Sequence, residues 1–439
     1  MKKLLLFCFL AVLNLTFSQQ TTLKVVGKNL TLTNGQTIIL RGINYPVIDE
    51  GTLNMNNPTN YQLFIDEAAK TGANTIRIMW YTDGTHWRDK PASNGTPGTM
   101  NGYVNNGHLN NLVAYCITKN MIPILEIHNV TCSNDWTAFN GVVMNFWKSA
   151  AIQTLIANNK SKLIINLANE FGKVRWGANP VQDLQVFKNN YIAAVASLRA
   201  LNINVPIMID APDCGQSSTE MLSVALSMNA ADPQNNLIFS AHTYWSGYAS
   251  TLSQIQTKLN EAQNTNVCYI LGEVANTQDN TSCGELDLST VYPLILQEAC
   301  SRNIGWLAWA FTQDCDPPRN MTPNGQYNNL TAWGNDIVNN VNYGLKSAGS
   351  CKAASLSNKK FESKLSDIEI YPNPSAGRFA IKTTQKIENV TCVDVVGKQV
   401  DLQFAGSNTY QIKATAKGVY VIKIELEGNK IISKKIIIE

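Results

Sequence analysis

Two glutamates in this chain each follow a run of apolar residues. Glu170 ends the segment Lys162–Glu170, KLIINLANE, and Glu273 ends Cys268–Glu273, CYILGE. Runs that are apolar on both faces are typical of strands in a parallel sheet covered by helices, and such sheets place their chemistry at the carboxyl edge. Two carboxyl groups that meet there, one protonated and one ionised, can break a glycosidic bond. We therefore expect Glu170 and Glu273 to form a catalytic pair.

Other polar or aromatic side chains stand at the ends of apolar runs in the same way. Each one alone has a structural explanation, because an arginine can form an ion pair, a histidine can be a hydrogen-bonded core residue and a tryptophan can belong to the core. The set as a whole favours one functional mouth, since polar groups buried at strand ends need partners. Its members are Arg77, His128, Asn169, His242, Tyr244 and Trp309.

These residues belong to a regular alternation of strands and helices. From Ile38 onward, eight apolar runs that predict strands alternate with eight segments that predict helices, one of them Asn140–Asn158. The alternation predicts an α/β fold, and eight units over roughly 320 residues fit a (β/α)8 TIM barrel. A hairpin around Asn34-Gly35 is expected before it. A doubly wound open sheet is the alternative, but no glycine-rich phosphate-binding motif follows the first strand.

The first residues have the pattern of an export signal. Lys2 and Lys3 precede the apolar run Leu4–Phe17, which is too short to span a membrane. We expect residues 1–19 to be a signal peptide and find no later stretch suited to a transmembrane segment. The net charge of +3 at pH 7 gives no reason to expect nucleic acid or an anionic membrane as a partner. The expected location is outside the cell or at its surface.

The chain contains ten cysteines, of which Cys8 lies in the expected signal peptide. Export permits disulfide bonds, although their pairing does not follow from the sequence alone. Cys283 and Cys315 lie just after two candidate neighbouring strands, which makes a bridge between those loops reasonable, and Cys132 and Cys214 hold similar positions. No paired cysteine or histidine spacing supports a metal site, and no cofactor is implied.

The end of the chain differs in kind from the rest. Residues 346–365 are polar and read as a linker, and residues 366–439 contain short β-rich runs separated by turns, which predict a small all-β sandwich. The segments Tyr371–Gly377 (YPNPSAG), Val396–Lys398 and Lys417–Tyr420 resemble the C-terminal sorting domain of the bacterial type IX secretion system. This resemblance implies that the type IX machinery is a partner. A carbohydrate-binding module is the alternative, which the small number of aromatic residues weakens.

Residues 20–345 form the expected barrel domain and contain several motifs in a fixed order, namely NTIRI, LEIH, INLANE, FSAHTY, LGE and GWLAW. With these motifs the domain resembles glycoside hydrolase family 5, whose members are retaining β-glycanases on a (β/α)8 barrel. Within the family it looks most like the bacterial endo-β-1,4-mannanases. The resemblance implies that Glu170 is the general acid/base and that Glu273 is the nucleophile.

The same resemblance implies roles for the supporting residues. Arg77 and Tyr244 would hold the nucleophile ionised, and Asn169 would hydrogen-bond the sugar 2-hydroxyl group. Trp309 would stack on the sugar at the cleavage point, and the polar floor would be completed by His128 and His242. Part of the remaining tryptophans are expected to face the cleft, the candidates being Trp80, Trp136, Trp176 and Trp245.

The substrate is less well defined than the chemistry. Related mannanases carry a His-Ser/Ala-Trp-aromatic segment after the first strand, whereas Asn44 is followed here by Tyr-Pro-Val-Ile-Asp. We expect a plant-type polysaccharide, first of all β-mannan, with glucomannan and cellulose left open. A non-catalytic glycan-binding barrel is a further alternative, which loss of either glutamate would favour. A metal-dependent hydrolase using His128, Asp210 and His242 would call for a closely spaced histidine pair, and none is present.

Overall fold

The computed structural model describes residues 23–84, 100, 102–347, 368–394, 398–413, 417–427 and 430–439. Two compact units make up the chain, Met1–Ser357 and Asn358–Glu439. The expected signal peptide, residues 1–19, and nearly all of the expected linker, residues 346–365, lie outside the described residues.

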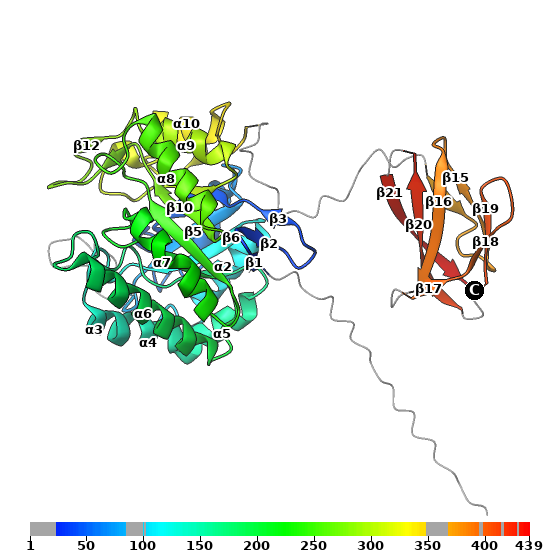
Figure 1. The fold of residues 1–439 in the computed structure, drawn as a ribbon, viewed down its shortest axis with the longest axis horizontal. Helices are drawn as coiled ribbons and strands as arrows, with labels where there is room; N and C mark the ends of the chain where they lie inside the picture. Colours follow the sequence, from blue (N-terminus) through cyan, green and yellow to red (C-terminus); the bar gives the residue numbers. More distant parts are fainter. Residues whose placement is uncertain are drawn as a thin grey trace, which may run out of the picture. The chain divides into compact units, whose positions relative to one another are not determined.

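The first unit is a closed barrel of parallel strands (Figure 1), which confirms the predicted fold. Every residue of these strands is buried, as expected for strands that face the barrel interior on one side and helices on the other. In chain order the strands are β4 (Arg41–Tyr45), β5 (Thr75–Trp80), β6 (Ile122–Ile127), β7 (Ile164–Asn166), β8 (Ile207–Asp210), β9 (Leu237–His242), β10 (Cys268–Val274) and β13 (Gly305–Ala308).

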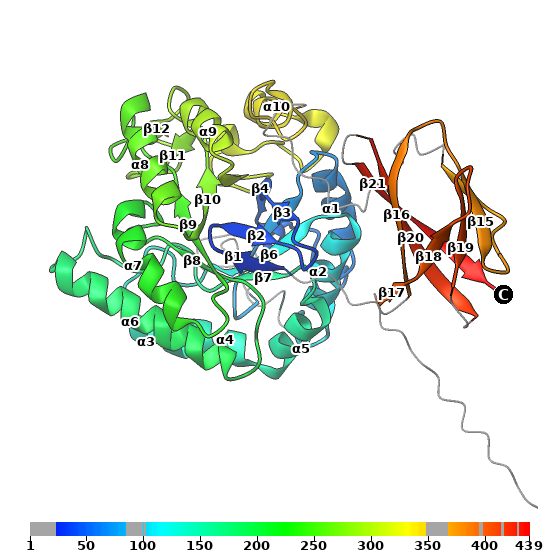
Figure 2. The same ribbon diagram turned by 45° about the vertical axis from the view of Figure 1, so that its right-hand side comes forward.

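A ring of helices surrounds the barrel (Figure 2). Local sequence sets several helix starts: Asn179 caps α6, which has Pro180 in its first turn, and Thr251 and Gln254 form a capping box on α8. The helices that follow the strands are α1 (Tyr61–Ala69), α2 (His108–Thr118), α5 (Ala150–Asn159), α6 (Pro180–Arg199), α7 (Ser218–Ala231), α8 (Leu252–Asn264), α9 (Tyr292–Ser301) and α10 (Ala332–Asn339).

The prediction of a single helix over Asn140–Asn158 is wrong. Ser149 has an extended backbone and separates α5 from three short pieces, α3 (Trp136–Ala138), a π-helical turn (Phe139–Val143) and α4 (Met144–Lys148). The interruption goes with a tertiary contact, because the buried Trp147 indole N–H donates a 2.9 Å hydrogen bond to the carbonyl oxygen of Leu167 beside the barrel. Packing therefore overrides the helical propensity of this segment.

A small sheet closes the amino-terminal end of the barrel. Strands β1 (Lys24–Val26), β2 (Asn29–Thr31) and β3 (Thr37–Ile38) pair antiparallel, with the predicted Asn34-Gly35 turn between β2 and β3. Their side chains share one apolar cluster with residues from the starts of the barrel strands. In Figure 2 this sheet is dark blue and lies over the middle of the ring. The opposite end, where the strands finish, is therefore the open one.

The second unit consists of two four-stranded antiparallel sheets. Side chains from both sheets, including Phe379, Tyr410 and Ile422, form one apolar core, which agrees with the predicted all-β sandwich. One sheet contains β14 (Glu369–Tyr371), β15 (Arg378–Lys382), β19 (Thr409–Ile412) and β18 (Leu402–Phe404), and the other β17 (Gln399–Val400), β16 (Ile387–Asp394), β20 (Gly418–Leu426) and β21 (Lys430–Ile438). No helix in the described part of the chain is long and apolar enough to cross a membrane.

Because each unit has its own core, we expect deletion of residues 366–439 to leave the barrel folded. The barrel transition in differential scanning calorimetry should shift by less than about 2 °C, which for a domain of this size corresponds to less than about 1 kcal/mol. A larger drop would show that the barrel depends on the sandwich for stability.

Candidate active site

A cavity of about 900 Å³ lies at the carboxyl ends of the barrel strands. Of the eight predicted site residues, six line it: His128, Asn169, Glu170, Tyr244, Glu273 and Trp309. The other two, Arg77 and His242, are buried behind the lining, with 1% and 0% of their surface exposed. The structure thus brings all eight residues into one site.

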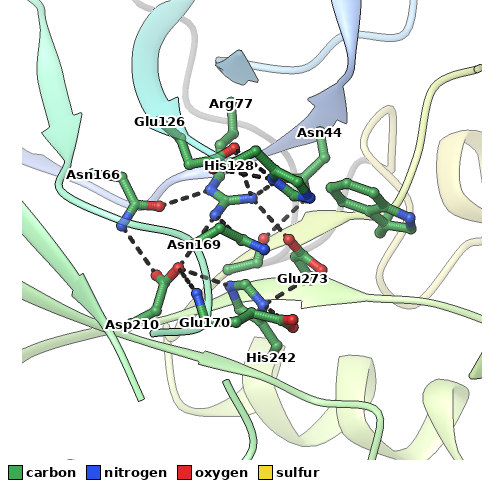
Figure 3. A network of polar contacts seen from close by, with 12 residues as sticks. Asn44, Arg77, Glu126, His128, Asn166, Asn169, Glu170, Asp210, His242 and Glu273 are labelled. Atoms are coloured by element: carbon green, nitrogen blue, oxygen red, sulfur yellow. Dashed lines mark hydrogen bonds and ion pairs between the residues drawn. The ribbon is translucent and has the colours of Figure 1, made fainter. Parts of the chain in front are cut away.

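The Arg77 guanidinium is the centre of the polar network (Figure 3). It comes from β5 and donates to side chains that belong to four other strands or the residues following them. Five hydrogen bonds leave it, to Glu273 Oε1 (2.8 Å), Asn44 Oδ1 (3.0 Å), Asn166 Oδ1 (2.9 Å), Asn169 Oδ1 (2.6 Å) and Asp210 Oδ2 (3.2 Å). All the donor groups of this buried charge therefore point at acceptors, as burial of a cation requires.

The Glu273 carboxylate receives a donor on each oxygen. Arg77 Nη1 donates to Oε1 at 2.8 Å, and the Tyr244 hydroxyl group donates to Oε2 at 2.7 Å. Burial, together with the nearby charge of Glu273, raises the pKa of Tyr244 well above its usual value, so the phenol keeps its proton. Two such donors fix the carboxylate in one orientation.

The surroundings of Glu170 are different. Its Oε1 lies 2.7 Å from Nδ1 of His242, and its backbone N–H donates to Asp210 Oδ2 at 3.2 Å. Its backbone is left-handed, with φ of +52°, an uncommon conformation for a non-glycine residue. Burial raises the pKa of Glu170 and outweighs the opposing effect of the His242 charge. Burial therefore favours the protonated form of Glu170.

The two carboxyl groups are close together. One oxygen of Glu170, one oxygen of Glu273 and a ring nitrogen of His242 all lie within 4.8 Å of one another. Carboxyl groups about 5–5.5 Å apart are typical of retaining glycosidases, whereas inverting enzymes separate them by about 6.5–9.5 Å. The arrangement suits direct attack by one carboxylate on a sugar that the other protonates.

Two glycines leave the space that the His242 ring occupies. A Cβ atom at Gly215, where φ is +75°, would come within 2.6 Å of the ring, and one at Gly272 within 3.0 Å. Burial alone would lower the pKa of His242, but the charges of Glu273 and Asp210 raise it to about 10. Burial would raise the pKa of Asp210, but His242 and Arg77 lower it to about 2. The imidazole is therefore a fixed cation at neutral pH.

His128 and Trp309 form the opposite wall of the site. His128 Nδ1 lies 3.1 Å from Oε1 of the fully buried Glu126, which fixes the orientation of the imidazole. The rings of His128 and Trp309 are stacked, with centroids 6.0 Å apart and an interplanar angle of 14°. The Trp309 indole N–H donates to Asp314. Both side chains are thus held rigidly from behind while they face the cavity.

Three groups of residues in the described part of the chain bring three potential metal ligands together. Two of them contain the Cys132–Cys214 and Cys283–Cys315 pairs, which are disulfide-bonded as their positions suggested and offer no thiolate. The third is Glu170, His242 and Glu273, whose atoms already pair with one another. His128 belongs to none of these groups, so the set required for the metal-dependent alternative is not assembled.

Sequence reasoning missed the part that four buried residues play in the network; of these only Asp210 had been considered, as a residue of the metal-dependent alternative. Asn44, Glu126, Asn166 and Asp210 all accept hydrogen bonds or ion pairs from Arg77 or His128. Each lies within or at the end of a barrel strand. A polar residue inside an otherwise apolar run was the signal that could have identified them.

The expectation about the other tryptophans is largely wrong. Trp80 and Trp245 are fully buried, and Trp136 packs edge-on against Phe171 and Tyr191. Among the described tryptophans only Trp176 and Trp309 line the cavity. The buried tryptophans are large side chains that fill the space between the strands and the helices of the barrel, and this packing keeps them out of the cavity.

Comparison with protein families agrees with this geometry. Residues 32–314 match the model of the cellulase family, glycosyl hydrolase family 5. The chain belongs to glycosyl hydrolase family 5. Residues 369–439 match the secretion system C-terminal sorting domain, which confirms the predicted resemblance of the tail and implies secretion or a cell-surface location. The first unit is therefore a glycoside hydrolase.

Relatives of this glycoside hydrolase include enzymes named mannanase and one named endoglucanase. The chain is 27% identical over 313 residues to a mannan endo-1,4-β-mannosidase of Streptomyces lividans, covering 70% of each chain. It is 25% identical over 323 residues to one from Cellvibrio japonicus, covering 72% of this chain and 66% of the relative. The mannanase catalytic domain of Streptomyces sp. SirexAA-E superimposes with a TM-score of 0.60 at 24% identity, over 78% of this chain and 96% of that one, which supports the fold.

The central position of Arg77 leads to a prediction. A lysine at this position has one nitrogen and cannot reach acceptors on five sides. We expect Arg77→Lys to lower the free energy of unfolding by at least about 2 kcal/mol and to lower kcat/KM at least ~100-fold, because the acceptors lose their positions. Urea unfolding and glycoside hydrolysis below the melting temperature would measure both.

Arg199→Lys is the matched control. Arg199 is buried and donates to both carboxylate oxygens of Asp232, at 2.9 and 2.8 Å, and neither residue lines the cavity. We expect the Arg199→Lys variant to lose a similar amount of free energy of unfolding and to keep the kcat/KM of the parent protein. Equal activity in the two variants would reduce Arg77 to a structural residue.

Proposed function

We propose that this protein is a secreted, endo-acting, retaining β-1,4-glycanase that hydrolyses plant-type polysaccharide, first of all β-mannan. In this proposal Glu273 is the nucleophile and Glu170 is the general acid/base. The observation that carries it is the pair of buried carboxyl groups within 4.8 Å of each other, one held by two donors and the other with a raised pKa. Their contrasting environments match the two roles that the reaction needs.

In the first step, Glu273 attacks the anomeric carbon while Glu170 donates its proton to the departing glycosidic oxygen. Arg77 and Tyr244 aim the attacking carboxylate and stabilise its charge until the bond forms. The raised pKa of Glu170 keeps it protonated at a pH where an ordinary glutamate has ionised. The product is a glycosyl ester on Glu273 and a released sugar chain with a new hydroxyl group.

In the second step, Glu170 accepts a proton from water, which attacks the anomeric carbon and releases Glu273. The His242 ring favours this exchange of roles, because its Nδ1 lies 2.7 Å from Glu170 Oε1 and 3.4 Å from Glu273 Oε2. Its positive charge stabilises whichever carboxyl group is ionised. Two displacements at one carbon return the original configuration, which is why the mechanism retains it.

The cavity supplies two separate aromatic platforms for sugar rings. Trp309 lies beside the catalytic pair, where we propose that Asn169 binds the 2-hydroxyl group. Trp176 follows β7 and is 49% exposed. The buried Asp213 carboxylate accepts hydrogen bonds from the backbone N–H groups of Val174, Arg175 and Trp176. A rigid second platform supports binding of several sugar units and hence cleavage within a chain.

The choice of mannan rests on the similarity to enzymes named mannan endo-1,4-β-mannosidase. The main alternative is an endo-β-1,4-glucanase using the same catalytic pair, since the matching family model is that of cellulases. The segment after β4 favours keeping this alternative, because its Pro46 and Asp49 line the cavity where related mannanases carry a different sequence. A non-catalytic glycan-binding barrel is disfavoured because both glutamates are present and paired.

The sorting domain supports export through the type IX secretion machinery as the partner of residues 366–439. Such a route ends either with the enzyme retained at the cell surface or with its release. In either case the barrel meets polysaccharide outside the cell.

The assigned roles predict opposite behaviour for two variants. Glu273→Ala should lower kcat by at least ~10⁴-fold on every substrate, and azide should restore turnover with the inverted product. Glu170→Ala should lower kcat on polysaccharide by ~10²–10⁴-fold but spare the first step on dinitrophenyl glycosides, whose leaving group requires no acid. NMR spectroscopy of the anomeric configuration of the product would test the azide rescue of Glu273→Ala. A Glu273→Ala variant that keeps most of its activity would refute the nucleophile assignment.

A substrate panel tests the specificity. We expect the initial rate of reducing-sugar release from β-mannan to exceed those from glucomannan, carboxymethylcellulose and xylan, with internal cleavage seen as a rapid loss of viscosity. A rate that is highest on carboxymethylcellulose would replace mannanase by endoglucanase and leave the catalytic pair unchanged. Binding to all four polymers without hydrolysis would favour the glycan-binding alternative.

A further inference from the structure

A disulfide bond lies directly against Glu170. Cys132 follows β6 and Cys214 follows β8, and their bond joins these two loops across the loop of β7, which carries Glu170. Cys132 Sγ lies 3.3 Å from Glu170 Oε2. Both cysteines line the cavity. The carboxyl group is therefore enclosed between the His242 ring on Oε1 and a sulfur atom on Oε2.

The backbone around this contact is unusual. Cys132, Glu170 and Cys214 all have left-handed backbone conformations, with φ of +57°, +52° and +53°. Such conformations are uncommon for residues other than glycine and persist where surrounding contacts impose them. A covalent bond between the two flanking loops is a contact of that kind, and it fixes the loop that carries the carboxyl group from both sides.

A disulfide sulfur can accept a hydrogen bond but cannot donate one. It has lone pairs but no hydrogen, so it can accept a weak hydrogen bond from a protonated carboxyl group and can donate nothing to a carboxylate. A thiol or a hydroxyl group at the same place could donate, which would stabilise the ionised form. The contact on Oε2 thus favours the protonated form of Glu170, whereas the His242 contact on Oε1 favours the ionised one.

We propose that the Cys132–Cys214 disulfide is a positioning element for Glu170, which fixes its carboxyl group in the cleft and keeps it a proton donor by offering it no hydrogen. This inference rests on the proposed role of Glu170 as general acid/base. Charged and titratable groups on every neighbouring strand or its following loop also act on Glu170, namely Arg77, His128, Asp210, His242, Tyr244 and Glu273.

Two double variants of the full-length chain test the inference. In Cys132→Ser/Cys214→Ser, a hydroxyl group can donate to the carboxylate, and we expect the alkaline limb of the kcat/KM profile to move about one pH unit to lower pH. In Cys132→Ala/Cys214→Ala, nothing can donate but the tie is lost. We expect kcat on polysaccharide to fall at least ~10-fold, with a smaller loss on a dinitrophenyl glycoside, which does not use the acid.

The matched control is Cys283→Ser/Cys315→Ser. It removes the other described disulfide between two strand-end loops, and neither of its sulfurs contacts Glu170. Its alkaline limb should stay where the parent protein has it, whatever happens to its melting temperature. A limb that moves equally in the serine variants of both disulfides would overturn the inference, because loop loosening in general would then explain the effect.

The inference also fails if the variants at Cys132 and Cys214 lose thermal stability but keep both the alkaline limb and the ratio of rates on the two substrates. The Cys132–Cys214 disulfide would then only stabilise the two loops that it joins. If the variants do not fold, the wild-type protein can be assayed with and without a phosphine reductant below its melting temperature. An unchanged limb after mass spectrometry shows reduction of Cys132 and Cys214 would overturn the inference, and an acid shift would support it.

Failure of this inference is distinguishable from failure of the proposed function. Glu170→Ala reports on the acid/base role by itself, through its dependence on the leaving group. If that dependence is found and the disulfide variants keep the parent profile, the proposed function stands and the positioning role falls.

Discussion

A positive charge buried at the centre of a barrel is the constraint on which this structure depends. Burial alone would lower the pKa of Arg77, but Glu126, Asp210 and Glu273 raise it, with ion-pair distances of 3.8, 3.2 and 2.8 Å. The partner on β6 belongs to the strand next to β5, whereas those on β8 and β10 lie further round the barrel. Full compensation of the charge therefore requires the closed ring. The complete site therefore depends on closure of the barrel, and an open sheet would leave the cation only partly compensated.

The same network gives two chemically identical side chains different surroundings. Glu273 meets donors of hydrogen bonds, Arg77 and Tyr244, on both oxygens. Glu170 is buried at the edge of the network, where the His242 ring is the charged group in direct contact with its carboxyl group. The difference lies in which loops and strands contribute the neighbouring groups, so the proposed division of roles depends on the fold and not on either glutamate alone.

Strand ends were predictable from the sequence because two physical signals coincide there. An apolar run that stops at a polar or aromatic residue identifies both a buried strand and the point where it leaves the core. This located Glu170, Glu273 and five of the six supporting residues, whereas Arg77 lies in the middle of β5. Tertiary packing is not encoded in such local signals. It breaks the helix at Ser149, buries Trp80 and Trp245 in the core, and selects Asn166 and Asp210 as acceptors for Arg77.

The space around His242 has a consequence for how this enzyme can change. Gly215 and Gly272 leave the space that the imidazole occupies, because a Cβ atom at these positions would come within 2.6 and 3.0 Å of the ring. A new side chain at either glycine would displace the ring. Substitutions that keep the imidazole in its present position must therefore be made at places other than these two glycines.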